Sequence, residues 1–156
     1  MENINNETEF ENHIRQIIQQ DILTSNSDLT LLTNKKAVDI VICRNNPNPT
    51  IFFLEIKYHK KNHGRLGFGQ GKGAGFQPEI LSRRPDIFEN NLRWIIGTEE
   101  SDKYFLLNNS ELSNYLQGGG VGDKFNGIQK KLFKDSVGIN REELVTKLKN
   151  WLTNKT

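Results

Sequence analysis

The stretch VDIVICRNNPNPTIFFLEIKYH, residues 38–59, contains two apolar runs around a segment of three asparagines and two prolines. That segment, residues 45–49, predicts a turn because proline and asparagine favour turn geometry over strand or helix. The flanking runs, 37–44 and 50–59, are rich in branched and aromatic residues and predict two strands. Together they predict an antiparallel hairpin, and three polar residues interrupt its apolar runs: Asp39, Glu55 and Lys57.

The expected register of this hairpin brings the three polar residues together. If the turn is symmetric about Pro47, Asp39 faces Glu55, and Lys57 follows on the same side because side chains alternate along a strand. Opposed carboxylates repel, so we expect a shared proton, a bound divalent cation or the Lys57 amine to offset the repulsion. A plain salt-bridged strand face is the structural alternative. A register slip of one residue would separate the group.

The remaining pattern predicts one layered domain. We expect a helix over residues 7–23, begun by a Thr8/Glu11 capping box, and a short strand within 29–37. Residues 77–91 predict two helical pieces broken before Pro85. Strands are expected at 92–98 and 103–109, and helices at 110–117, capped by Asn109 or Ser110, and at 141–153. This order predicts an α/β (α+β) fold, a single domain with a central mixed β-sheet flanked by helices.

Length and composition agree with a single domain of 156 residues, with its core over about 8–108 and a C-terminal helical part over about 109–156. The formal net charge of +2 excludes neither an acidic nor a basic partner. The polar N-terminus carries no signal-peptide pattern, and no apolar run reaches the ~20 residues that a membrane span needs. We therefore expect a cytoplasmic protein without a membrane partner. Trp94 and Trp151 are expected in the core.

Asp39, followed on the next predicted strand by Glu55-Ile56-Lys57, with a helix before both, resembles the motif of the PD-(D/E)xK nuclease superfamily. The resemblance covers roughly residues 8–100, and Val38 stands where the motif usually has proline. It implies a restriction-endonuclease-like fold, with Asp39, Glu55 and the carbonyl of Ile56 as ligands of Mg²⁺, for which Mn²⁺ substitutes. Lys57 would then orient or deprotonate the attacking water.

The same resemblance implies a further carboxylate from the first helix. We expect Glu11 in this role because it shares a helix face with Ile14 and Ile18, with Glu9 and Glu7 as alternatives. A capping role without catalysis is the other interpretation of Glu11.

By this resemblance the chain is most similar to a small type II restriction endonuclease, a homodimer that cleaves specific sites in double-stranded DNA. A Holliday-junction resolvase is the second expectation, and cleavage of RNA or of single strands is a third. From a different class, a non-catalytic nucleic-acid-binding or protein-interaction module would use Asp39, Glu55 and Lys57 only as a salt-bridge cluster.

A basic, glycine-rich segment follows the second strand. It is not a P-loop, because Lys72 is followed by Gly73 instead of serine or threonine. No acidic residue occurs between Glu55 and Glu79, which is typical of a loop that faces a polyanion; a solvated surface loop is the alternative. Candidate nucleic-acid contacts are Lys60, Lys61, Arg65, Gln70, Lys72, Gln77, Arg83 and Arg84. The three histidines have no metal-ligand spacing and are expected at the surface or on the side that faces phosphate.

Overall fold

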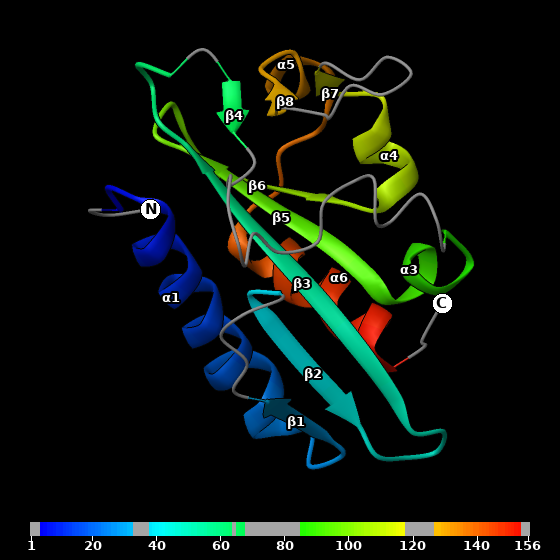
Figure 1. The fold of residues 1–156 in the computed structure, drawn as a ribbon. Helices are drawn as coiled ribbons and strands as arrows, with labels where there is room; N and C mark the ends of the chain where they lie inside the picture. Colours follow the sequence, from blue (N-terminus) through cyan, green and yellow to red (C-terminus); the bar gives the residue numbers. More distant parts are fainter. Residues whose placement is uncertain (1–3, 33–37, 64, 68–84, 118–126, 154–156) are drawn as a thin grey trace.

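A computed structural model describes residues 4–32, 38–63, 65–67, 85–117 and 127–153. Five strands form its main sheet: β1 (Leu29–Leu32), β2 (Ile40–Arg44), β3 (Thr50–His59), β5 (Leu92–Thr98) and β6 (Ser101–Leu107). Their order across the sheet is β1-β2-β3-β5-β6. Only the central β3–β5 pair is parallel, so the sheet is mixed, as the sequence predicts (Figure 1).

The hairpin has the predicted register. Ile40 pairs with Leu54 and Ile42 with Phe52. Strand β3 has the predicted bounds, because its run is rich in branched and aromatic residues and its side chains are buried on both faces. Strand β2 starts at Ile40, so Asp39 precedes the strand instead of pairing within it.

One face of the sheet is covered by the first and last helices, α1 (Glu7–Ile17) and α6 (Arg141–Thr153). Helix α1 runs on into a π-helical turn at Ile18–Ile22, and α6 lies behind the sheet in Figure 1. Apolar residues at helical spacing supply the core here, among them Phe10 and Ile14 against Ile40, Leu54 and Ile56 of the hairpin. The two terminal segments therefore close the same side of the sheet.

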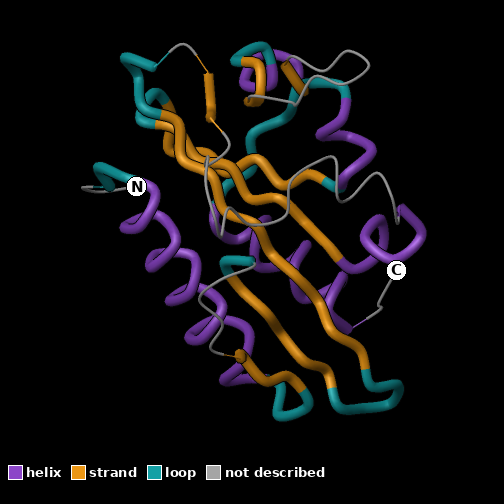
Figure 2. Tube along the Cα trace, in the orientation of Figure 1, coloured by secondary structure: helices purple, strands orange, loops and turns teal. Residues whose placement is uncertain are grey.

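The opposite face carries a second core and a small second sheet, which the sequence did not reveal. Strands β4 (Arg65–Gly67), β8 (Gly127–Gln129) and β7 (Leu116–Gln117) form it in that order. Helices α3 (Pro85–Asn91), α4 (Asn109–Ser113) and α5 (Leu132–Asp135) accompany it. Figure 2 shows helices on both sides of the sheet. Trp94 is at the centre of this core with 0% exposure, whereas Trp151 is only half-buried and donates its indole N–H to Asn90.

Two predicted helix caps are wrong. Helix α1 is capped by Asn6, whose side chain accepts a hydrogen bond from the amide of Glu9, and not by a Thr8/Glu11 box. Helix α4 is capped by Asn108, which forms a complete capping box with Glu111. In both cases an asparagine one or two residues earlier has the extended backbone that a cap requires. The earlier helical piece predicted within 77–91 lies outside the described residues.

No helix among the described residues is long and apolar enough to cross a membrane.

Candidate active site at the end of strand β3

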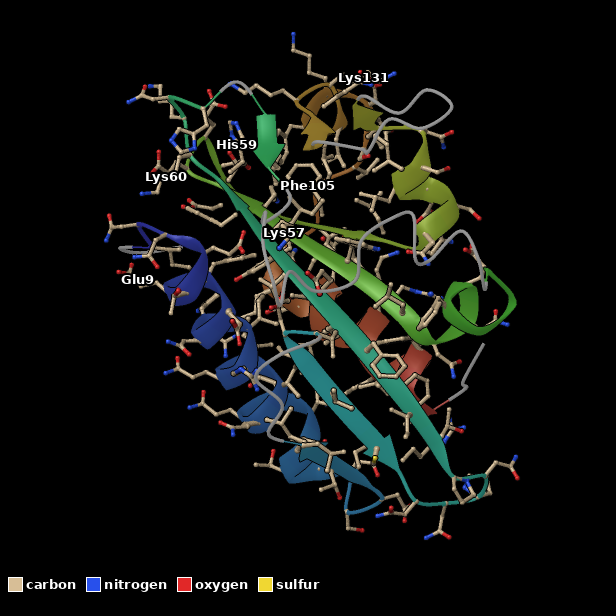
Figure 3. The ribbon with its side chains drawn as sticks, in the orientation of Figure 1. Glu9, Lys57, His59, Lys60, Phe105 and Lys131 are labelled. Atoms are coloured by element: carbon tan, nitrogen blue, oxygen red, sulfur yellow. The ribbon has the colours of Figure 1, made fainter. Side chains whose placement is uncertain are left out.

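Strand β3 extends past β2, and carboxylates occupy the edge that this leaves. The last pair of the hairpin is Ile40 with Leu54, while β3 continues to His59 (Figure 3). Amides on such an edge need other acceptors. Asp39 Oδ2 accepts from the amide of Ile56 at 2.6 Å, and Glu7 Oε2 accepts from the amide of Tyr58 at 3.4 Å. The side chains of Asp39, from the segment before β2, and of Glu7, from α1, are thereby fixed beside β3.

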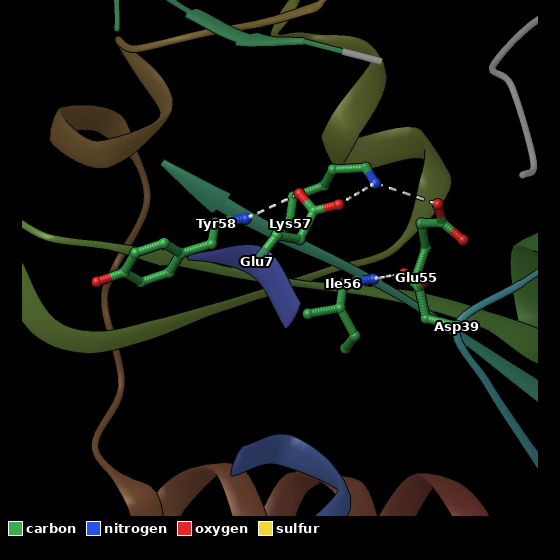
Figure 4. A network of polar contacts seen from close by, with 6 residues as sticks. All are labelled: Glu7, Asp39, Glu55, Ile56, Lys57 and Tyr58. Carbon is green, nitrogen blue, oxygen red and sulfur yellow. Dashed lines mark hydrogen bonds and ion pairs between the residues drawn. The ribbon is translucent and has the colours of Figure 1, made fainter. Parts of the chain in front are cut away.

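Glu55 and Lys57 project from β3 on the face that carries the second core. Their register partners on β5 are Trp94 and Ile96, both members of that core. The Lys57 Nζ atom lies 3.4 Å from Glu55 Oε1 and 3.3 Å from Glu7 Oε1. Figure 4 shows the amine between the two carboxylates. The site therefore assembles from α1, from the residue before β2 and from β3.

The relation between Asp39 and Glu55 differs in detail from the sequence expectation. Asp39 lies in a bend before β2, and its side chain turns to the Ile56 amide instead of standing opposite Glu55. Arg15 of α1 donates to the main-chain oxygen of Asp39 and holds the bend. The charge of Asp39 still raises the pKa of Glu55, so the two carboxylates interact.

Burial sets the protonation of the site. Glu55 is 4% exposed and Lys57 is 8% exposed. Burial, reinforced by the charge of Asp39, raises the pKa of Glu55 to about 8 against the opposing effect of Lys57. Burial also raises the pKa of Asp39, although the Ile56 amide and Lys57 oppose it. For Lys57, burial lowers the pKa, but the carboxylates of Glu55, Glu7 and Asp39 outweigh it and the pKa is raised.

These shifts describe a site with more buried negative charge than a single amine neutralises. At neutral pH, Lys57 is a cation and Glu55 largely keeps its proton. A divalent cation that displaced this proton would remove the electrostatic conflict.

The donor set fits a magnesium ion. Glu55 Oε2 is buried without a hydrogen-bond partner among the described residues, and a hard cation would satisfy such an oxygen. Within those residues no cluster of three or more His, Cys, Asp or Glu side chains could hold a metal. Two carboxylates suffice for Mg²⁺, because it commonly keeps waters or takes substrate phosphate oxygens as its other ligands. Asp39, Glu55 and the carbonyl of Ile56 remain the candidate ligands.

The helix carboxylate that reaches the amine of Lys57 is Glu7, one of the three candidates. Glu11, the residue that we expected, forms a 2.8 Å ion pair with Arg15, although its charge contributes to the raised pKa of Asp39. Glu9 accepts hydrogen bonds from Asn5 and Asn6 at the start of the helix. Glu7, Glu11 and Arg15 recur every four residues and form one stripe along α1.

The candidate nucleic-acid contacts are only partly within the described residues. Lys60 and Lys61 lie in the turn that follows β3, and Arg65 begins β4. The remaining candidates, Gln70, Lys72, Gln77, Arg83 and Arg84, lie outside the described residues.

His59 is where the sequence prediction fails most clearly, because it is 1% exposed instead of lying at the surface. It continues the alternation of β3 and points to the second core, where its ring lies 5.4 Å from that of Phe133. The alternation from Glu55 through Lys57 to His59 was a usable signal for this placement.

No protein-family model matches the chain. A search of curated proteins finds no significant match either.

Proposed function

We propose that the protein is a Mg²⁺-dependent endonuclease that hydrolyses phosphodiester bonds of double-stranded DNA. The supporting observation is the buried amine of Lys57 within 3.4 Å of Glu55, whose second oxygen has no hydrogen-bond partner among the described residues. A buried carboxyl group that could exchange its proton for a cation, next to a fixed ammonium, suits a reaction that develops negative charge on phosphoryl oxygens. Sequence-specific cleavage as a cytoplasmic homodimer, with one site for each DNA strand, is the most direct form of this proposal.

In this proposal, each polar residue of the site has a role. Asp39 and Glu55, with the carbonyl of Ile56, would hold the ion. When bound, Mg²⁺ supplies positive charge at the phosphate and lowers the pKa of a coordinated water. Lys57, which is a cation at neutral pH, would orient the attacking water and present positive charge to the scissile phosphate. Glu7 would position Lys57, since its carboxylate lies 3.3 Å from the amine and is fixed in turn by the Tyr58 amide.

Substrate binding would fall to the basic residues that follow β3. Lys60 and Lys61 lie in the turn three and four residues after Lys57. They would contact phosphates, which position nucleic acid without reading its sequence. Arg65, Gln70, Lys72, Gln77, Arg83 and Arg84 remain the candidates for further phosphate or base contacts.

The test is cleavage of mixed plasmid and phage DNA with Mg²⁺ or with EDTA. Wild type is compared with Asp39→Asn and Lys57→Met, because asparagine still accepts from the Ile56 amide and methionine keeps the apolar length of the side chain. Lys147→Met is the matched control, since Lys147 is an exposed residue of α6 on the other side of the sheet. Discrete Mg²⁺-dependent fragments from wild type and Lys147→Met, lost in both site variants, are expected. Nicking of branched DNA alone would indicate a resolvase instead.

A non-catalytic module is the second candidate, because one observation favours it. The carboxylates of Asp39 and Glu7 both satisfy edge amides of β3, so they already serve the fold. Calorimetric titration with Mg²⁺ and Mn²⁺ separates the two functions. A nuclease site predicts binding that disappears in Asp39→Asn, whereas a structural cluster predicts no heat that depends on Asp39. If folded wild type cleaves no DNA, the non-catalytic module becomes the better supported function.

A further inference from the structure

The buried imidazole of His59 makes two hydrogen bonds that define its tautomer. Its Nε2 atom lies 2.7 Å from the main-chain oxygen of His63, and its Nδ1 atom lies 3.4 Å from Thr98 Oγ1. A carbonyl oxygen only accepts, so Nε2 must carry the proton. In the neutral ring, Nδ1 is then an acceptor for the Thr98 hydroxyl. His59 therefore joins the turn after β3 to the neighbouring strand β5.

This bond is part of a set that fastens the turn of residues 60–63 to the end of the sheet. The amide of His63 donates to the Lys60 carbonyl at 3.0 Å. The amide of Lys61 donates to Glu99 Oε2 at 2.8 Å, and the amide of Glu99 donates to the His59 carbonyl at 3.0 Å. Of the two histidines in this set, His59 is buried and His63 is exposed. Figure 3 shows His59 and Lys60 at the same end of β3.

The surroundings of His59 oppose a positive charge on its ring. Burial lowers its pKa, Lys130 and His63 act in the same direction, and the bond to the His63 carbonyl and the charge of Glu100 oppose them only in part. Phe133 of α5 offers only an aromatic face. Protonation would bury a cation beside Lys130, and it would require the Thr98 hydroxyl, which already accepts from the Glu100 amide, to reorient.

We propose that neutral His59 is a positioning residue that holds the Lys60–Lys61 turn where it binds the phosphates of nucleic acid, and that acidification releases this turn. This inference takes its ligand, nucleic acid, from the proposed function. The hydrogen bonds that fasten the turn are independent of that function. The sign follows from linkage: a group with a lowered pKa in the folded state costs stability as pH falls below its ordinary value. The docked turn is thus favoured at neutral pH and weakened in mild acid.

The experiment measures binding of a labelled DNA duplex, in EDTA, at about pH 7.5 and about pH 5.8, on either side of the ordinary histidine pKa. His59→Gln keeps an N–H donor for the His63 carbonyl but does not titrate. His13→Gln is the matched control: His13 is a part-buried histidine whose pKa is likewise lowered, and it bonds to Tyr104 on the side of the sheet that α1 and α6 cover. The quantity compared is the change in affinity between the two pH values for each variant.

Acidification makes the protein surface more positive and so strengthens DNA binding in wild type and in both variants. We expect wild type and His13→Gln to gain less than His59→Gln by about threefold, the order of the salt-dependent part of one phosphate contact. Equal gains in wild type and in both variants would overturn the proposal.

A second measurement does not depend on DNA binding. In an NMR titration, with the His59 signal assigned by its loss in His59→Gln, this ring should show the pKa lowered by burial. The protection factor of the Lys61 amide should fall on acidification in wild type but not in His59→Gln. If neither wild type nor the variants bind DNA, the proposed function fails, and the protection of the Lys61 amide then tests the role of His59. Loss of protection in acid that is confined to wild type supports the positioning role. Equal protection in wild type and His59→Gln overturns it.

Discussion

The amide of Ile56 donates a 2.6 Å hydrogen bond to Asp39 Oδ2, so a carboxylate occupies the place that strand β2 would take if it were longer. The pairing of the two hairpin strands therefore stops at Ile40 and Leu54, just before the polar residues Asp39 and Glu55. One aspartate both completes the edge of β3 and brings negative charge beside Glu55.

Substitution at Asp39 should separate its structural role from its charge. We expect Asp39→Ala to lose about 1–3 kcal/mol of unfolding free energy, because the buried Ile56 amide loses its acceptor. Asp39→Asn should be at least as stable as wild type without metal, because burial already raises the pKa of this carboxyl and so favours the neutral form. Denaturant unfolding in EDTA measures both. Equal destabilisation by Ala and Asn would contradict this assignment.

Glu55 should make stability depend on pH in metal-free protein. Its pKa rises from 4.5 to about 8 on folding, so the folded state keeps a proton that the unfolded state loses. The resulting stabilisation is complete below about pH 4.5, decreases as pH rises and is lost above about pH 8. Glu55→Gln removes this dependence.

The measurement is the difference in unfolding free energy between Glu55→Gln and wild type across this range in EDTA. The difference should grow in favour of the glutamine variant as pH rises. Using the difference cancels the contributions of His13 and His59, whose pKa values are lowered and act with the opposite sign. A constant difference would show that Glu55 titrates normally in the folded protein.

Glu7→Gln should affect activity more than stability. The amide can still accept from the Tyr58 N–H, and the lost ion pair is half-exposed at Glu7, so we expect a cost below about 1 kcal/mol. Cleavage should fall about tenfold, as for residues that orient a functional side chain. Because the charge of Glu7 helps to raise the pKa of Lys57, the alkaline limb of the pH–rate profile should move to lower pH.

Glu11→Gln is the control for this experiment, since Glu11 pairs with Arg15 on the same helix stripe. It should cost a similar small stability and leave the alkaline limb in place. If Glu11→Gln and not Glu7→Gln moved that limb, Glu11 would be the functional carboxylate that the sequence analysis expected.

Gly97→Ala should weaken the packing of α1 against the sheet. A Cβ atom at Gly97 would lie 2.6 Å from Cζ of Phe10, the buried aromatic residue of α1 that packs there. We expect a loss of about 1–3 kcal/mol in unfolding free energy. Phe10→Leu should make room, so the double variant should lose less than the sum of the single variants. Strict additivity would show that the two residues do not press on each other.

The sequence was most informative where local pattern and burial agree. The mainly branched and aromatic run of Thr50–His59 and the proline-rich turn before it predicted β3 and the hairpin register correctly. It was less informative about helix starts, because Asn6, Thr8 and Asn108 to Ser110 are all capable caps and the choice depends on where the chain turns. Strands β4, β7 and β8 escaped prediction because two or three residues carry no periodicity.

The candidate site divides in the same way. Asp39, Glu55 and Lys57 could be recognised from the sequence. Charged residues are unusual within two paired apolar segments, and strand alternation places these three near one another. The choice among Glu7, Glu9 and Glu11 could not, because each lies on a turn of the same helix and the distance of that helix from β3 is a tertiary quantity. The burial of His59 depended likewise on α5, whose Phe133 packs against it from 74 residues further along the chain.

By itself, then, the amino-acid order determined the strand pattern, the hairpin register and the three polar residues Asp39, Glu55 and Lys57, since these follow from period-2 alternation and turn chemistry over short spans. Only the tertiary structure decided which helix carboxylate meets Lys57, that Asp39 takes an edge amide, and that Glu55 and His59 are buried. Hydrogen-bond partners and desolvation depend on which distant segments pack together, and no local pattern encodes that packing.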